Sequence, residues 1–274
     1  MNARLAHGFA RLVLGLAAVL ALAPLAFMLG TALKPEHDVF AAAANPFPMH
    51  PTVANFRAAL AGLAFPRLFA VSITFALGVT LGQLLLAIPA AYAFARERVP
   101  GGDVLFALVV ATLPIPFVVT YIPNYLVLAR AGMLGTLPGL IVPQLACAYA
   151  IFLLRQHFRA FPRSVIDAAA VDGAGPFATL VRVVVPANGA ALAALGIYIF
   201  VNTWNQYIWP LLVLNDPAFT TLTVGVQNFA NGEGGSAWGT LMAAATLATL
   251  PTLVAYAAVR KTLLATLAEG AVKG

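Results

Sequence analysis

Amide and indole side chains gather at residues 202–207, N-T-W-N-Q-Y, within an otherwise apolar stretch. Asn202, Asn205, Gln206 and Trp209 recur at helical spacing, so a continuous helix would place them on one face. Because amides cannot stay unpaired in hydrocarbon, that face must meet another helix or a wet cavity. Amides and indoles are also suited to holding the hydroxyls of a polyol or sugar. The segment therefore predicts either helix-to-helix contact or the lining of a solute path. The candidate path residues are Asn202, Trp204, Asn205, Gln206 and Trp209, and weaker candidates for the same cavity are Gln83, Asn124, Gln144 and Tyr149.

Catalytic chemistry finds little support in the sequence. The four histidines lack the spacing of a metal or nucleophile site, and the lone Cys147 is interpreted as a small buried side chain. The chain has no G-x-x-x-x-G-K-[ST] phosphate loop, so we expect any ATP to be used by a partner. The long apolar runs contain no acidic residue, which argues against an ion-coupled carrier. They also contain no Ser-His or paired-Asp arrangement, which argues against an intramembrane enzyme. We therefore expect no catalytic residue, no metal site and no cofactor in this chain.

A mildly polar insert, residues 164–186, interrupts the apolar chain. Ser164 stands three residues before Asp167, which predicts a capping-box-like helix start after a proline. Gly173 and Gly175 can adopt the positive φ that ends a helix, so a first helix of about two turns is expected before them. The three alanines after Asp167 leave this helix thin enough to enter a groove on another protein.

A second short helix is expected to follow at Pro176. Phe177, Leu180, Val181 and Val184 recur at helical spacing and predict one apolar face. The two helices around a glycine turn would form a docking device for another protein. The alternative is a helical connector that lies on the membrane surface.

Composition places the chain among polytopic membrane proteins. It is 62% hydrophobic and only 9% charged. No basic face with interleaved aromatic residues indicates nucleic-acid binding. Six membrane-spanning helices are expected in one domain covering residues 1–274. The expected spans are 12–33, 68–95, 104–128, 136–156, 189–213 and 237–259, with external loops 34–66 and 214–236 and a cytoplasmic coupling loop 157–187.

The first and third of these spans have particular features. A cleaved signal peptide is the rival interpretation of the first, but its apolar run is long and we favour an uncleaved anchor. The third contains Pro114, Pro116 and Pro123, which predict a bent helix. Such a helix is expected near a transport pathway or at a moving joint, or is simply a kinked packing helix.

The basic residues predict the orientation of the chain. Six spans place both termini on one side, and 11 of the 15 lysines and arginines fall on that side. Only Lys34, Arg57, Arg67 and Arg130 fall on the other. Because basic residues flank membrane segments on the cytoplasmic side, both termini and residues 157–187 are expected in the cytoplasm.

The polar insert carries a resemblance to a known family. D-A-A-A-V-D-G-A at Asp167 to Ala174, followed by Phe177 and by Val185-Pro186, resembles the EAA loop of binding-protein-dependent ABC importer permeases of the carbohydrate, maltose-type class. The resemblance implies an all-α fold with six membrane helices, the type I ABC importer permease fold. Asp167 stands in place of the motif's Glu and is one methylene shorter. The residues implied to contact the ATPase are Asp167, Ala168, Ala169, Asp172, Gly173, Ala174, Phe177 and Pro186.

Three further segments indicate which members of this family the chain resembles most. They are F-L-L-R-Q-H-F at Phe152 to Phe158, W-N-Q-Y-I-W-P-L-L at Trp204 to Leu212, and N-G-E-G-G-S-A-W at Asn231 to Trp238. They are similar to the smaller permeases of sn-glycerol-3-phosphate importers. The implied substrate is sn-glycerol 3-phosphate or glycerophosphodiesters, and the alternative is another carbohydrate such as a di- or oligosaccharide.

The resemblance also implies partners and a place in the cell. The expected partners are a second permease, an ATPase dimer that binds ATP and Mg²⁺, an external solute-binding protein and the lipid bilayer. The expected location is the bacterial cytoplasmic (inner) membrane. The residues implied to contact the binding protein are Asn228, Asn231, Gly232, Glu233 and Gly234.

Overall fold

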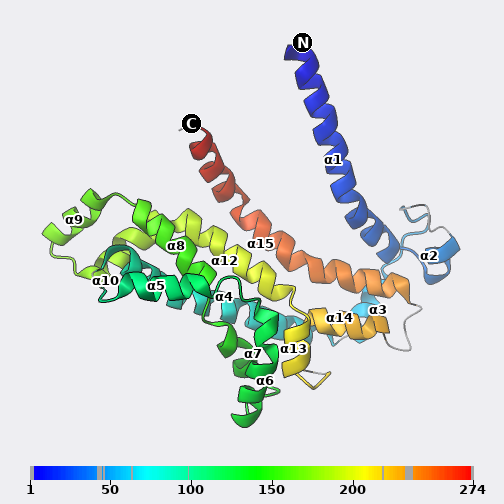
Figure 1. Cartoon of the computed structure of the whole chain (residues 1–274). Helices are drawn as coiled ribbons and strands as arrows, with labels where there is room; N and C mark the ends of the chain where they lie inside the picture. The colour runs from blue at the N-terminus through cyan, green and yellow to red at the C-terminus, as the bar shows by residue number, and fades with distance from the viewer. Residues whose placement is uncertain are drawn as a thin grey trace. The chain divides into compact units, whose positions relative to one another are not determined.

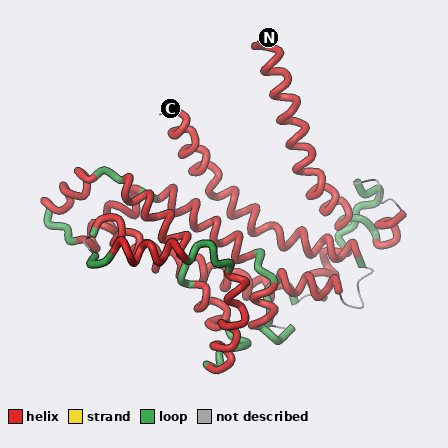
Figure 2. The backbone as a smooth tube through the Cα atoms, viewed as in Figure 1, coloured by secondary structure: helices red, strands yellow, loops and turns green. Residues whose placement is uncertain are grey.

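The computed structural model describes residues 3–41, 45, 47–62, 64–97, 99–217, 219–231 and 237–272. Over these residues every regular element is a helix and none is a strand, as Figure 2 shows. Figure 1 gives the helix labels used below. The described chain divides into two compact units, Met1–Leu68 with Leu222–Leu250 and Phe69–Thr221 with Pro251–Gly274.

The first unit is built from α1 (Ala3–Ala32), α2 (Glu36–Ala41), α3 (Ala54–Gly62), α14 (Leu222–Asn231) and the first part of α15 (Trp238–Val272). Its small core centres on Ala32, Ala59, Ala243 and Ala244. The Asn55 amide donates to the carbonyls of Ala32, at 2.9 Å, and of Lys34, at 2.7 Å. These bonds satisfy carbonyls that the end of α1 leaves free.

The second unit is organised around α4 (Phe65–Arg96), whose inner side chains meet the later helices of the unit. Two glycines one turn apart on α4 allow close packing. A Cβ on Gly78 would lie 2.7 Å from Ile141 Cδ1, and a Cβ on Gly82 would lie 2.4 Å from Leu145 Cδ2. Small residues at this spacing let helix backbones approach closely in membranes.

Breaks interrupt three of the later helices, and the first of them contains two prolines. The first break separates α5 (Gly102–Ala111) from the short η1 (Phe117–Thr120) and α6 (Tyr121–Arg130). The second separates α7 (Leu137–Ile141) and η2 (Val142–Gln144) from α8 (Ala148–Ala160), with a bend of 49°. The third separates α12 (Gly189–Trp204) from α13 (Ile208–Val213).

Three of the described helices are long and apolar enough to cross a membrane, and two bent pairs raise this number to five. The continuous ones are His7–Ala32, Phe65–Arg96 and Trp238–Arg260. Residues 104–128, the predicted third span, are interrupted more strongly than the predicted bend, because the chain leaves the helix after Ala111 and Pro116 is extended. Proline lacks the N–H that continues a helix and clashes with the preceding turn. Six spans therefore stay a prediction.

Candidate functional site

The polar insert forms a helix-turn-helix at one end of the second unit, where Figure 1 shows α9 and α10. Helix α9 runs over Arg163–Val171 and ends in a Schellman motif: Gly173 N donates to Ala170 O at 3.0 Å, and Ala174 N donates to Ala169 O at 2.9 Å. Gly173 has φ +81°, which confirms that this glycine ends the helix. Gly175 has φ −70°, so the same prediction for Gly175 is wrong.

The predicted capping box at the start of α9 is also wrong. Pro162 holds the N-cap position with φ −59° and ψ 128°, and no side chain caps the helix. Ser164 lies inside the helix, because the proline already breaks the preceding α8 and Arg163 becomes the first helical residue.

The turn presents large apolar side chains away from the core. Val171 is 88% exposed and Phe177 is 76% exposed, one on each side of Gly173. Asp167, Ala168 and Asp172 are exposed beside them, and Ala169 and Ala174 are half-buried. The turn therefore combines exposed apolar and exposed acidic side chains.

The second helix of the insert differs from the predicted single apolar face. Helix α10 (Pro176–Thr179) continues into η3 (Leu180–Val184), which is π-helical, and then α11 (Val185–Ala187). Leu180 and Val184 are buried, whereas Phe177 and Val181 are exposed. The wider π turn changes the register of the side chains and ends at Val184. Pro186 follows in α11; it is exposed and cannot donate to the preceding turn.

Two arginines tie the base of this insert to α4. Arg96, the last residue of α4, donates from Nε to Phe158 O at 2.9 Å and from Nη2 to Phe158 O at 2.6 Å. Its Nη2 also donates to the carbonyls of Arg159 and Phe161. The Arg96 guanidinium therefore caps the last turn of α8, where a positive charge is favoured.

Arg155 makes the reciprocal contact from α8. Its side chain is buried, and its Nε donates to Phe94 O of α4 at 3.1 Å. Its guanidinium carbon lies 3.8 Å from the centre of the Phe106 ring on α5. We call Arg96 and Arg155 together the arginine clasp. The sequence shows only two basic residues at the ends of apolar runs. It does not indicate their partners, because these lie about 60 residues away along the chain.

A cavity of about 540 Å³ lies where the three helix breaks meet. Thr112, Leu113 and Ile115 line it from the first break, residues 146–148 from the second, and Gln206 from the third. Irregular backbone at membrane depth is tolerated where it is buried in protein or lines a water-filled cavity. The geometry therefore favours a wet cavity at this position.

Three glutamines form a hydrogen-bonded chain in the wall of this cavity. Gln83 Nε2 donates to the Gln144 backbone O at 2.7 Å, and Gln206 Nε2 donates to Gln144 Oε1 at 2.7 Å. Gln206 Oε1 is buried and accepts no hydrogen bond from the described residues. Tyr149 lines the same cavity, so Gln83, Gln144, Tyr149 and Gln206 are brought together. Asn124 is not among the lining residues, and its amide donates to Thr120 Oγ1 at 3.3 Å.

Comparison with known proteins places these features in a family. The family model of the binding-protein-dependent transport system inner membrane component matches residues 83–264. The chain belongs to this family. The permease is therefore a transport component of the inner membrane, and its matched region contains both the helix-turn-helix and the glutamine-lined cavity.

Individual relatives agree with this assignment. The permease is 37% identical over 184 residues to the sn-glycerol-3-phosphate transport system permease protein UgpE of Pectobacterium atrosepticum. This alignment covers 67% of this chain and 66% of the relative. It is 32% identical over 210 residues to the protein of the same name from Brucella abortus, in an alignment that covers 74% of each chain.

A solved structure shows the fold. A chain from the crystal structure of a bacterial ABC transporter involved in the import of the acidic polysaccharide alginate matches with a TM-score of 0.81 and 22% identity. The match covers 94% of this chain and 96% of that chain. The permease accordingly has the all-α, type I ABC importer permease fold.

The predicted amide face of the permease does not form, because α12 ends at Trp204 and residues 205–207 are not helical. The Asn202 and Asn205 amides are exposed and donate to their own helix, at Tyr198 O and Val201 O, each at 2.7 Å. Only Gln206 of the predicted path residues lines the cavity.

The two tryptophans of the predicted path are buried in packing contacts. Trp209 is fully buried, donates from Nε1 to Leu140 O at 3.0 Å and packs against Phe117 and Tyr121. Trp204 packs edge-on against Phe69, with ring centres 5.8 Å apart. Both rings are therefore packed among other side chains, and neither lines the cavity.

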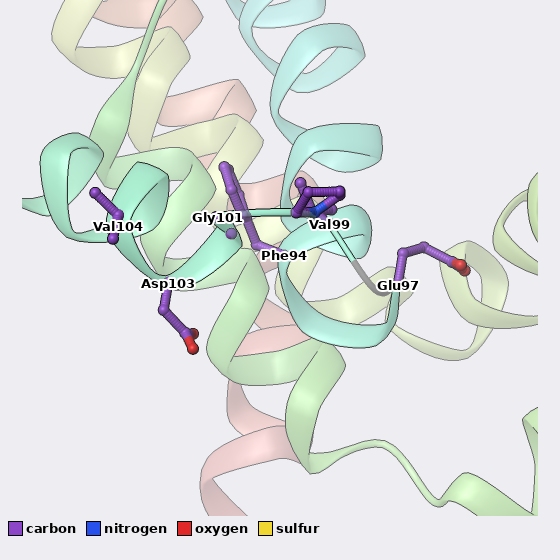
Figure 3. Close-up of a pocket in the computed structure, with 8 residues that line it drawn as sticks. Phe94, Glu97, Val99, Gly101, Asp103 and Val104 are labelled. Carbon is purple, nitrogen blue, oxygen red and sulfur yellow. The ribbon is translucent and has the colours of Figure 1, made fainter.

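A second cavity of about 620 Å³ lies at the turn between α4 and α5 of the permease. Glu97 and Asp103 line it, and Figure 3 shows their carboxylates pointing in different directions. Among the described residues no cluster of three metal-ligating side chains occurs. The arrangement does not form a paired-carboxylate site.

The predicted contacts with the binding protein fall at the edge of the described structure. Asn228 and Asn231 belong to α14, where only their backbone is described. Gly232, Glu233 and Gly234 lie outside the described residues. Their role stays a prediction.

Proposed function

We propose that this permease forms one half of the membrane channel of an ATP-driven importer and receives its energy from a separate ATPase subunit through the α9 turn. The observation that carries the proposal is the exposed pair Val171 and Phe177 around Gly173, in a chain of the binding-protein-dependent family. The residues at this contact are Asp167, Ala168, Ala169, Asp172, Gly173, Ala174, Phe177 and Pro186.

The partners follow from this role. A second permease completes the channel, an ATPase dimer docks on α9, and an external binding protein delivers the solute to residues 228–234. Both termini and residues 157–187 face the cytoplasm. The excess of basic residues on that side supports this orientation.

The proposed substrate is sn-glycerol 3-phosphate or a glycerophosphodiester. Permeases that are 32% and 37% identical carry the name of the sn-glycerol-3-phosphate system, which supports this choice. A second candidate is an uncharged di- or oligosaccharide. It is favoured by one observation: the described residues that line the glutamine cavity carry no charge. For a phosphate, the cationic groups would come from the companion permease or the binding protein.

Reconstitution into lipid vesicles tests the proposal. The chain is assembled with its companion permease, ATPase and binding protein, and uptake of radiolabelled sn-glycerol 3-phosphate is measured with and without ATP. We expect ATP-dependent uptake only with all components present. Uptake by this chain alone would contradict the need for a partner ATPase. Uptake of maltose but not of sn-glycerol 3-phosphate would favour the second candidate.

A further inference from the structure

The helical segment that follows the Gly173 turn meets α12 at a sharp bend. This segment, Pro176–Ala187, comprises α10, η3 and α11, and its axis makes an angle of 81° with that of α12. Asn188 is the single residue between the two helical segments. A movement of the Gly173 turn therefore passes along the chain to α12 only through Asn188.

The residues on either side of Asn188 do little to fix this angle. Pro186 has no N–H and cannot bond to the preceding turn. Gly189 has no side chain, and a Cβ built there would have no other described atom within 4 Å. Pro186, Ala187 and Gly189 are all exposed, so they add little packing to the bend. The angle therefore depends strongly on the hydrogen bonds made at Asn188.

Asn188 is hydrogen-bonded to both sides of the bend. Its Nδ2 donates to Val184 O, the last residue of the π-helical turn, at 2.8 Å. Its backbone N–H lies 3.0 Å from Val184 O and 3.2 Å from Val185 O, as a shared bond. On the other side, Asn188 O accepts from Leu192 N of α12 at 3.0 Å. One residue thus joins the two segments through its main chain and its side chain.

The Asn188 side chain acts in an unusual direction for its position. Asparagine at the N-cap of a helix ordinarily accepts a bond from the first turn of that helix. Asn188 is the N-cap of α12, with φ −102° and ψ 19°, but within the described structure its side chain makes no such bond. It bonds backwards to a carbonyl four residues earlier, and side-chain bonds of this kind compete with the regular helix and accompany bends.

We propose that Asn188 is a positioning residue for energy coupling. Its amide sets the angle between Pro176–Ala187 and α12, and thereby the direction in which a movement of the Gly173 turn is passed to α12. The inference rests on the proposed function, since it assumes that energy from the ATPase enters at that turn.

The angle at the bend is measured with two spin labels in the reconstituted complex. In a Cys147→Ala background, labels at Arg182→Cys and Tyr198→Cys occupy exposed positions on the two sides of Asn188. Asn188→Ala should shift and broaden the distribution of distances between the labels. Asn188→Ser should keep the original distribution, because a serine hydroxyl can donate to the carbonyl four residues earlier.

The consequence for transport is measured as solute uptake per ATP hydrolysed. Asn188→Ala should lower this ratio about fivefold, the effect of one lost neutral hydrogen bond, and Asn188→Ser should restore it. The KM for the solute and basal ATP hydrolysis should not change. A role in stability alone would lower the amount of complex in the membrane and leave the ratio unchanged.

Thr74→Ala is the matched control. Thr74 is exposed on the unbroken α4, and its Oγ1 donates to Ala70 O, again four residues earlier, at 2.8 Å. This variant should keep the wild-type ratio. If Asn188→Ala does not assemble, Asn188→Asp serves in its place, because a carboxylate cannot donate to Val184 O but still suits an N-cap.

Three results would overturn the inference. They are an unchanged distance distribution in the variant without the donor, an unchanged ratio of uptake to ATP hydrolysis in that variant, and an equal loss of this ratio in Asn188→Ala and Asn188→Ser or Thr74→Ala. In all three the wild-type complex still imports solute. They are therefore distinct from failure of the proposed function, in which the complete wild-type complex transports nothing.

Discussion

Gly173 shows how one residue type shapes the turn that follows α9. Its φ of +81° lies in the left-handed region, and its N–H closes the Schellman motif at the end of α9. A side chain at this φ costs about 1–2 kcal/mol, most of all when it is β-branched. A Cβ added at Gly173 or at Gly175 would have no other atom within 4 Å. The two positions therefore differ only in their backbone conformation.

We expect Gly173→Val to distort the turn and to lower uptake and solute-stimulated ATP hydrolysis at least about tenfold, the effect of about 1.4 kcal/mol. The variant should still insert into the membrane, which quantitative blotting of membrane fractions checks. Gly175→Val is the control, since φ −70° and ψ 169° suit valine. Equal activity of the two variants would remove Gly173 from the coupling role.

At the level of elements, the arginine clasp connects α4 to α8 and to the segment that leads into α9. Arg96 donates to three carbonyls at the end of α8, and α9 begins two residues after the last of them, at Arg163. The same α4 carries Gln83, which bonds to the cavity wall. The end of α8, which leads into α9, is therefore hydrogen-bonded to α4. Tight packing at Gly78 and Gly82 also connects α4 to Ile141 and Leu145.

We expect Arg96→Ala to uncouple the importer. Loss of charge-assisted bonds, each contributing about 1.5–3 kcal/mol, should lower uptake per ATP hydrolysed about tenfold while basal ATP hydrolysis persists. Arg96→Lys should restore part of the coupling, because it keeps the charge but loses the planar fork. Coupling is measured as the ratio of solute uptake to phosphate release in vesicles.

Arg159→Ala provides the control for the clasp. Arg159 is exposed on the same turn of α8, and its backbone carbonyl, which survives the substitution, is the only part that bonds to Arg96. We expect wild-type coupling in this variant. If Arg96→Ala also retained wild-type coupling, the arginine clasp would be a packing feature without a role in coupling ATP hydrolysis to uptake.

For the whole molecule, the orientation of the chain decides which partner meets which surface. Two exposed histidines report on opposite sides: His50 in the predicted external loop and His157 at the edge of the coupling loop. In a Cys147→Ala background, His50→Cys should react with a membrane-impermeant maleimide in intact spheroplasts. His157→Cys should react only after lysis. The reverse pattern would place α9 outside and contradict docking of a cytoplasmic ATPase.

The whole molecule also leaves surfaces for other chains or lipid. Residues 7–27 of the apolar stretch of α1 are exposed within the described structure, and burial begins only at its end, with Gly30, Thr31 and Ala32. An apolar helix of this kind is stable only in a bilayer or against another protein. This exposure agrees with an inner membrane component that works inside a larger assembly.

The sequence by itself determined the class of the protein and the end of α9. Both depend on local properties: 62% hydrophobic residues exclude a soluble domain, and a glycine is favoured wherever the chain takes a positive φ. The basic residues at the ends of the apolar runs likewise predict an orientation without any knowledge of tertiary contacts.

Only the tertiary structure decided which amides share a cavity and which arginines link the helices. The amide face at residues 202–209 assumed a continuous helix, but α12 ends at Trp204 and Gln206 turns toward Gln144. Gln83 and Gln206 lie about 60 residues from Gln144 on either side, and Arg96 lies 62 residues from Phe158. Helical periodicity describes neighbours along one element. The choice of hydrogen-bond partners across such separations is made by the packing of helices, because a buried polar group bonds to whatever donor or acceptor the fold brings within reach.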